Sequence, residues 1–100
     1  MTAKHLLDPI HPGEILHEEF LVPLGISAHA LARELRVPVT RVTEILRGRR
    51  AITADTALRL ARYFGTSGEL WVGLQAEYDL RVTRRAKGAE IERDVRPRAA

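Results

Sequence analysis

Two apolar stripes separated by a very short linker constrain the fold of this chain more than any other feature. The members of the first recur at the i, i+3, i+4, i+7 spacing of a buried helical face, and those of the second at i, i+3, i+4. The first stripe comprises Ala28, Leu31, Ala32 and Leu35, and the second comprises Val42, Ile45 and Leu46. Only residues 36–38 lie between the two predicted helices, so these must cross steeply rather than lie antiparallel.

This geometry is that of a helix-turn-helix, and its ends are marked in the sequence. Ser27 can cap the first helix, Pro38 is suited to the opening turn of the second, and Gly48 can end it in a left-handed conformation. Spacings of three and four recur elsewhere, whereas alternating strand patterns are absent. We therefore predict an all-α protein, a compact five-helix bundle of the lambda-repressor-like helix-turn-helix type.

The remaining boundaries follow from proline, glycine and capping residues. We expect a first helix that starts near Pro12 and ends before Pro23, a fourth that runs from Thr53 to Gly65, and a fifth from Ser67 to about Arg85. Residues 1–11 are predicted to be an N-terminal arm and residues 12–85 the helix-turn-helix domain. Residues 86–100 lose periodicity, so they are expected to be a mobile basic tail or to extend the last helix partway.

Composition excludes several functional classes. The chain has 100 residues and no cysteine, so we expect one domain without disulfides or thiolate metal sites, suited to a reducing cytoplasm. No apolar run is long enough to cross a membrane, and no signal peptide is recognisable. Neither a nucleophile motif nor a glycine-rich phosphate loop is present. We expect no enzymatic activity, no cofactor and no small-molecule substrate.

Charge is distributed unevenly along the chain. The net charge is only +3, yet residues 33–50 hold six arginines against two acidic residues, and residues 81–100 hold seven basic residues against three acidic ones. Arginine clusters attract phosphate backbones through charge and bidentate hydrogen bonds, which makes nucleic acid the first partner to test. A solvated charged face is the alternative explanation of the same pattern.

The second helix of the pair carries a polar face opposite its apolar stripe. This face comprises Thr40, Thr43, Glu44 and Arg47, with Val39 and Arg41 beside it. Threonine and glutamate can contact base edges, and arginine can bind guanine or phosphate. Arg49 and Arg50 follow the helix end, where the chain passes a DNA strand in this docking mode, and are predicted to bind phosphate. Spacing alone also allows these residues to form the polar side of an ordinary surface helix.

Three longer stretches resemble a known family. HPGEIL, ITADTALRLARYFGTS and ELWVGLQAEYDL, within the run from His11 to Leu80, resemble the HigA-type antitoxins, a branch of the XRE-like helix-turn-helix regulators. The resemblance implies a homodimer that binds double-stranded operator DNA. It also implies a HigB-type toxin partner, a small ribonuclease that cuts messenger RNA on the ribosome, which the antitoxin holds inactive while the pair represses its own operon.

The same resemblance assigns roles by position. It makes the segment from Pro38 to Arg47 the recognition helix and brings Ser27 and Ala28 close to phosphates. The predicted DNA-binding set is Ser27, Ala28, Pro38, Val39, Thr40, Arg41, Thr43, Glu44, Arg47, Arg49 and Arg50. One departure is the RGRR segment at 47–50, where the family pattern usually reads NGKR. The extra arginine favours phosphate binding at the end of the helix.

Two alternative functions remain open at this point. The chain could be a stand-alone regulator without a toxin, or an interaction module that sequesters a toxin and binds DNA weakly. The four histidines do not share the spacing of a helical metal site, so surface positions are expected for them. Trp71 and Tyr78 are expected in the core, with partial contribution to an interface, rather than in a ligand-binding box.

Overall fold

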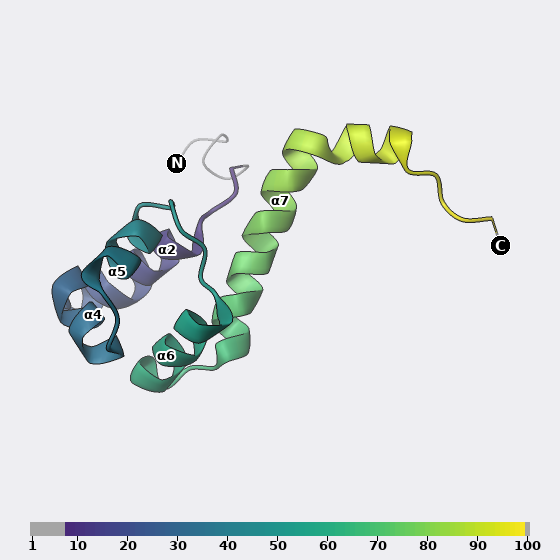
Figure 1. Ribbon diagram of the computed structural model, residues 1–100. Helices are drawn as coiled ribbons and strands as arrows, with labels where there is room; N and C mark the ends of the chain where they lie inside the picture. The colour runs from purple at the N-terminus through teal and green to yellow at the C-terminus, as the bar shows by residue number, and fades with distance from the viewer. Residues whose placement is uncertain (1–7, 100) are drawn as a thin grey trace.

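The computed structural model describes residues 8–99, and every regular element among them is helical (Figure 1). The elements are α2 (Pro12–Ile15), the π-helix η1 (Leu16–Leu21), α3 (Val22–Leu24), α4 (Ala28–Leu35), α5 (Val39–Leu46), α6 (Ala54–Phe64) and α7 (Gly68–Asp94). The first three follow one another without a break. Counted as one segment, they give five helices in the described residues, which confirms the predicted fold class. The first seven residues of the predicted N-terminal arm lie outside the described residues.

The first helical segment continues past Pro23, although the sequence predicted that it would end before this proline. Proline lacks an N–H and clashes with the preceding turn of a regular α-helix. Here the π-helical segment η1 directly precedes α3, and the N–H of Val22 donates to the carbonyl of His17, five residues back. This wider register lets the segment include Pro23 and end at Gly25, which has a left-handed φ of 65°.

Trp71 of α7 lies at the centre of the core. Its side chain is completely buried, and its ring centroid lies 5.0 Å from that of Phe20 and 6.5 Å from that of Phe64. The indole Nε1 donates to the hydroxyl of Thr66 at 2.8 Å, which satisfies its one polar group. The predicted core position of Trp71 is therefore confirmed. The other buried apolar side chains belong to Leu16, Leu21, Leu31, Ala32, Leu35, Val42, Ile45, Ile52, Ala57, Leu60 and Ala61.

The linker between α4 and α5 has the predicted length. Helix α4 ends at Leu35 and α5 begins at Val39, with Pro38 as its N-cap rather than its first residue. Arg36 closes α4 in the left-handed conformation, with a φ of 60°, and Ser27 caps the same helix by accepting a hydrogen bond from the N–H of Ala30. The two helices contact each other closely, as the short linker requires.

Helix α7 is the longest element and projects beyond the other helices (Figure 1). It continues through Asp94, so the helical extension that the sequence left open is present and the tail begins later than residue 86. This part of the chain is rich in good helix formers such as alanine, lysine, arginine and glutamate. It can therefore form a helix without an apolar stripe. Among the described residues, no helix combines the length and apolar character needed to span a membrane.

Candidate nucleic-acid interface

Helix α5 has a buried face and an open face, as its spacing predicted. Val42 and Ile45 are almost fully buried, and Leu46 packs partly against the same core. On the other side, Thr40 and Arg47 are exposed, whereas Thr43 and Glu44 are partly exposed. The hydroxyl of Thr43 donates to the carbonyl of Thr40 at 3.3 Å. The four polar side chains thus form one continuous surface.

Three residues of the predicted DNA-binding set have structural roles at the beginning of the two helices. Val39 and Ala28 are half-buried and pack against the core, and Pro38 precedes α5 without a side-chain hydrogen bond. Only part of the Val39 and Ala28 side chains remains available to a ligand, whereas Pro38 is exposed. Ser27 is exposed, although its hydroxyl already serves as the cap of α4.

Arg41 is turned toward α6 rather than toward the open face of α5. Its Nη1 lies 2.9 Å from Oδ1 of Asp55, and Nε of Arg59 lies 2.7 Å from the same carboxylate oxygen. Arg59 also donates to the backbone carbonyl of Leu35 at the end of α4. The hydrogen bond from Arg59, followed by the other contacts of the two guanidinium groups, lowers the pKa of the Asp55 carboxyl. This network connects α4, α5 and α6.

The remaining three arginines of the set differ in their partners. Nη2 of Arg50 lies 2.6 Å from Oε1 of Glu44, so two residues predicted to bind DNA form an ion pair with each other. Arg47 and Arg49 are exposed and form no ion pair with any residue from 8 to 99. Both guanidinium groups are therefore available to phosphate.

A glycine-ended turn places these arginines at the end of α5. Gly48 has a φ of 72°, its N–H donates to the carbonyl of Ile45, and the N–H of Arg49 donates to the carbonyl of Glu44. This pattern is the Schellman motif, which turns the chain sharply at a helix C-terminus. The predicted end of the helix at Gly48 is confirmed, with Arg47 as the C-cap.

Sequence reasoning missed Gln75, which supports the loop that follows. This side chain is buried, its Oε1 accepts from the N–H of Ile52 at 2.8 Å, and its Nε2 donates to Asp79 at 3.0 Å. A polar residue four positions after Trp71, on the buried face of α7, was the available signal. Gln75 thereby holds the segment after α5 against α7.

His11 was expected on the surface, but the structure places it at a junction. Its Nδ1 accepts from the N–H of Gly13 at 2.9 Å and so caps α2, while its ring lies edge-on to Tyr78 of α7 at 4.9 Å. Burial lowers the pKa of His11, although nearby Asp79 and a hydrogen bond with the backbone of Arg50 oppose this shift. The ring therefore favours its neutral form, which can accept the capping hydrogen bond.

Gly13 brings the backbone of α2 into contact with that of α5. A Cβ atom on this residue would overlap the backbone carbonyl of Ile45, so only glycine allows the two helices to approach this closely. Pro12 beside it is buried and occupies the first turn of α2. These contacts give a structural reason for the HPGEIL segment: it supports α5 from behind.

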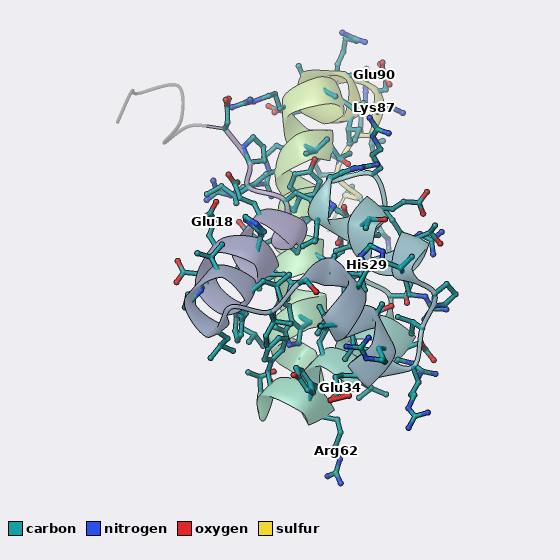
Figure 2. The ribbon with its side chains drawn as sticks, turned by 90° about the vertical axis from the view of Figure 1, so that its left-hand side faces the viewer. Glu18, His29, Glu34, Arg62, Lys87 and Glu90 are labelled. Atoms are coloured by element: carbon teal, nitrogen blue, oxygen red, sulfur yellow. The ribbon has the colours of Figure 1, made fainter. Side chains whose placement is uncertain are left out.

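The side chains outside this surface include no candidate metal site among the described residues. Within residues 8–99, no group of three or more histidine, aspartate or glutamate side chains is arranged to hold a metal ion. Figure 2 shows Glu34 of α4 and Arg62 of α6 near one end of the molecule, with Lys87 and Glu90 of α7 at the other end. Glu34 and Arg62 also line one surface pocket between α4 and α6, together with Leu35, Arg59 and Tyr63.

Comparison with known proteins supports the helix-turn-helix interpretation and identifies its branch. Residues 18–71 match the family model described as helix-turn-helix. A HigA-family addiction module antidote protein from Coxiella burnetii is 52% identical, with a TM-score of 0.87 and coverage of 91% of this chain and 99% of that chain. The chain belongs to the HigA family of helix-turn-helix antitoxins. This confirms the family expected from the three sequence segments.

Two further relatives of this HigA-family chain extend the comparison. The Pseudomonas aeruginosa antitoxin HigA, solved with the higBA promoter, is 49% identical with a TM-score of 0.88, over 91% of this chain and 99% of that chain. Virulence-associated protein I of Dichelobacter nodosus is 54% identical over 86% of this chain and 80% of its own length. The likeness thus covers nearly the whole described fold, including the supports of α5.

Proposed function

We propose that this HigA-family protein binds operator DNA in the cytoplasm, with α5 in the major groove, and represses its own operon together with a toxin. The observation that carries this proposal is the open face of α5, with Thr40, Thr43, Glu44 and Arg47 side by side. An α-helix fits the major groove, where these side-chain types can distinguish base pairs. The Pseudomonas relative solved with its promoter supports the proposal.

The roles of individual residues follow from their surroundings. Thr40 and Glu44 are proposed to contact base edges, with Thr43 and part of Val39 alongside them. Arg47 and Arg49 are proposed to bind phosphates at the end of the helix, while Ser27 and Ala28 approach the opposite strand at the start of α4. Arg41 contributes indirectly, because its guanidinium contacts Asp55 of α6 rather than lying on the open face of α5.

A selection experiment followed by binding titrations tests this function. The purified protein is used to enrich duplexes from a library with a randomised core, and dissociation constants are then measured on the enriched duplex and on single-base-pair variants. We expect Thr40→Ala to relax the preference at one position by roughly tenfold, the order of one base contact. Arg49→Ala should weaken all duplexes alike and lower the salt dependence by about one unit of slope. Enrichment of no sequence would contradict the proposal.

The proposed protein partners are a second copy of the chain and a HigB-type ribonuclease. A two-fold dimer would read two half-sites spaced about 34 Å apart, one turn of DNA. Sedimentation of the purified protein measures the dimer. Co-expression with the adjacent reading frame, followed by co-purification, tests the toxin. A protein that binds its operator but retains no such partner would be a stand-alone regulator, and one that retains the toxin but binds DNA weakly would be a sequestering module.

A further inference from the structure

We infer that Arg50 determines sequence specificity by holding the carboxylate of Glu44, rather than serving as a phosphate contact like its neighbour Arg49. The inference rests on the proposed function, because it concerns how the open face of α5 reads DNA. From its position just after the helix, Arg50 was predicted to bind phosphate. The inference replaces this role with the positioning of Glu44, a side chain proposed to contact a base.

The geometry of the helix end brings the two side chains together. Glu44 lies in the last turn of α5, and the Schellman turn at Gly48 folds the following residues back along this helix, with the N–H of Arg49 on the carbonyl of Glu44. Nη2 of Arg50 then lies 2.6 Å from Oε1 of Glu44, so the two charged groups form a close ion pair. Arg49, one residue earlier, makes no such contact within residues 8–99.

The pair resolves an electrostatic difficulty at this position. A glutamate carboxylate can accept a hydrogen bond from the amino group of cytosine in the major groove. However, DNA phosphates repel a carboxylate, and Glu44 is the only acid among the four side chains of the open face. The guanidinium of Arg50 beside Oε1 of Glu44 offsets this repulsion and restricts the glutamate side chain. Oε2 of Glu44 is then left to face the base.

The pair contributes little to the stability of the free protein, since its side chains are 45% and 43% exposed and exposed ion pairs are weak. Its effect should arise in the complex, where water is excluded and charged hydrogen bonds strengthen. A role for Arg50 is therefore measured by sequence preference on DNA, not by the stability of the free protein.

The experiment uses the duplex enriched by the wild-type protein and its single-base-pair variants. Dissociation constants are compared for Glu44→Ala, Arg50→Ala, the double variant and Arg50→Lys, with Arg49→Ala as the matched control. We expect Glu44→Ala and Arg50→Ala to lose preference at the same base pair, each by roughly tenfold. The double variant should lose no more than either single one, and Arg50→Lys should recover part of the preference. Low salt keeps weak complexes measurable.

One result on Arg50→Ala would overturn the inference without contradicting the proposed function. If Arg50→Ala retains every base preference, weakens all duplexes equally and lowers the salt slope as Arg49→Ala does, Arg50 is a phosphate contact. A wild-type protein that enriches no sequence would instead contradict the proposed function itself, and the inference with it. Circular dichroism of each variant verifies that the fold is retained, which the exposure of both side chains leads us to expect.

Discussion

Arg36 is the one described non-glycine residue with a positive φ, and it closes α4 just before the linker to α5. A side chain in the left-handed region costs about 1–2 kcal/mol through contact of Cβ with the backbone. In this left-handed conformation, the N–H of Arg36 still donates to the carbonyl of Arg33, and this hydrogen bond closes the turn at the end of α4. The three-residue linker between α4 and α5 therefore begins with a backbone geometry that suits glycine better than arginine.

Replacing Arg36 by glycine should accordingly stabilise the protein. The relief of strain exceeds the added entropy of glycine in the unfolded chain, and we expect a gain of about 0.5–1 kcal/mol in the free energy of unfolding. Urea denaturation followed by circular dichroism measures this gain. Arg36→Ala removes the same charge but keeps Cβ, so an equal gain in that control would assign the effect to charge instead.

His11 makes the stability of the fold depend on pH. Its pKa lies below the ordinary value of 6.5, mainly because of burial, so the unfolded chain binds its proton more readily than the native protein does. The stability that neutral His11 contributes is fully present above pH 6.5 and is lost as the pH falls through the lower native pKa. Protonation also removes the Nδ1 acceptor that caps α2.

The variant His11→Asn separates this effect from general acid destabilisation. Asparagine is a good N-cap and does not titrate, so the fall in unfolding free energy between pH 7.5 and about pH 5 should be smaller than in the wild type. Chemical denaturation at both pH values measures the difference. An identical fall in both proteins would show that His11 is not responsible.

At the scale of elements, the contact between α2 and α5 leaves no room for a side chain at Gly13. The backbone of Gly13 approaches the carbonyl of Ile45 so closely that a methyl group would force the two helices apart. Helix α5 is held there by main-chain contact, whereas Arg41 and Asp55 hold its other side through an ion pair.

Gly13→Ala should destabilise the protein by about 3 kcal/mol, toward the upper end for overpacking in a well-packed interior. It should also weaken DNA binding, since α5 shifts with its support. Gly73→Ala is the matched control, because a Cβ there meets no atom within 4 Å and alanine favours helix by about 1 kcal/mol. Thermal denaturation of both variants measures the contrast, and equal stability of the two would contradict the close contact.

The sequence allowed good prediction of those elements whose signals are local. The apolar stripes, Ser27 and Gly48 predicted α4 and α5 because helical periodicity and capping act within a few residues. The first helix was predicted too short, since a π-helical register that accommodates Pro23 has no simple sequence pattern.

Contacts between distant residues could not be predicted in this way. Gln75 supports Ile52 across 23 positions, and Arg41 reaches Asp55 across 14, so neither contact follows from spacing along one helix. The ion pair of Glu44 with Arg50 depends on the path of the chain after Gly48. The sequence was enough to predict which residues form the polar face of α5. It was not enough to predict which of their charged side chains already form ion pairs within the protein.

At the scale of the whole molecule, the two ends of α7 differ in their burial. Trp71 and Gln75, near its beginning, are the only buried residues of this helix, and nearly all side chains after Asp79 are exposed. Within one chain, the part of α7 after Asp79 therefore lengthens the helix (Figure 1) but contributes no buried side chain to the core.

Removal of residues 86–100 should change the unfolding free energy by less than about 1 kcal/mol, because nearly all of the described residues among them are exposed and their surface pairs are weak. The helical signal in circular dichroism should fall in proportion to the residues removed. Urea denaturation at two protein concentrations measures the effect. A loss above about 2 kcal/mol that depends on concentration would instead place the distal part of α7 in contact with a second copy.

The glycine contact behind α5 also bears on how such proteins diversify. Since the backbone of α2 and the pair of Arg41 with Asp55 secure this helix from its inner side and flank, Thr40, Thr43 and Arg47 can be exchanged without repacking the interior. Under the proposed function, mutational drift at these positions would alter operator choice while the fold is preserved. Paralogous modules within one genome can thereby become insulated from one another through a few surface substitutions on an unchanged scaffold.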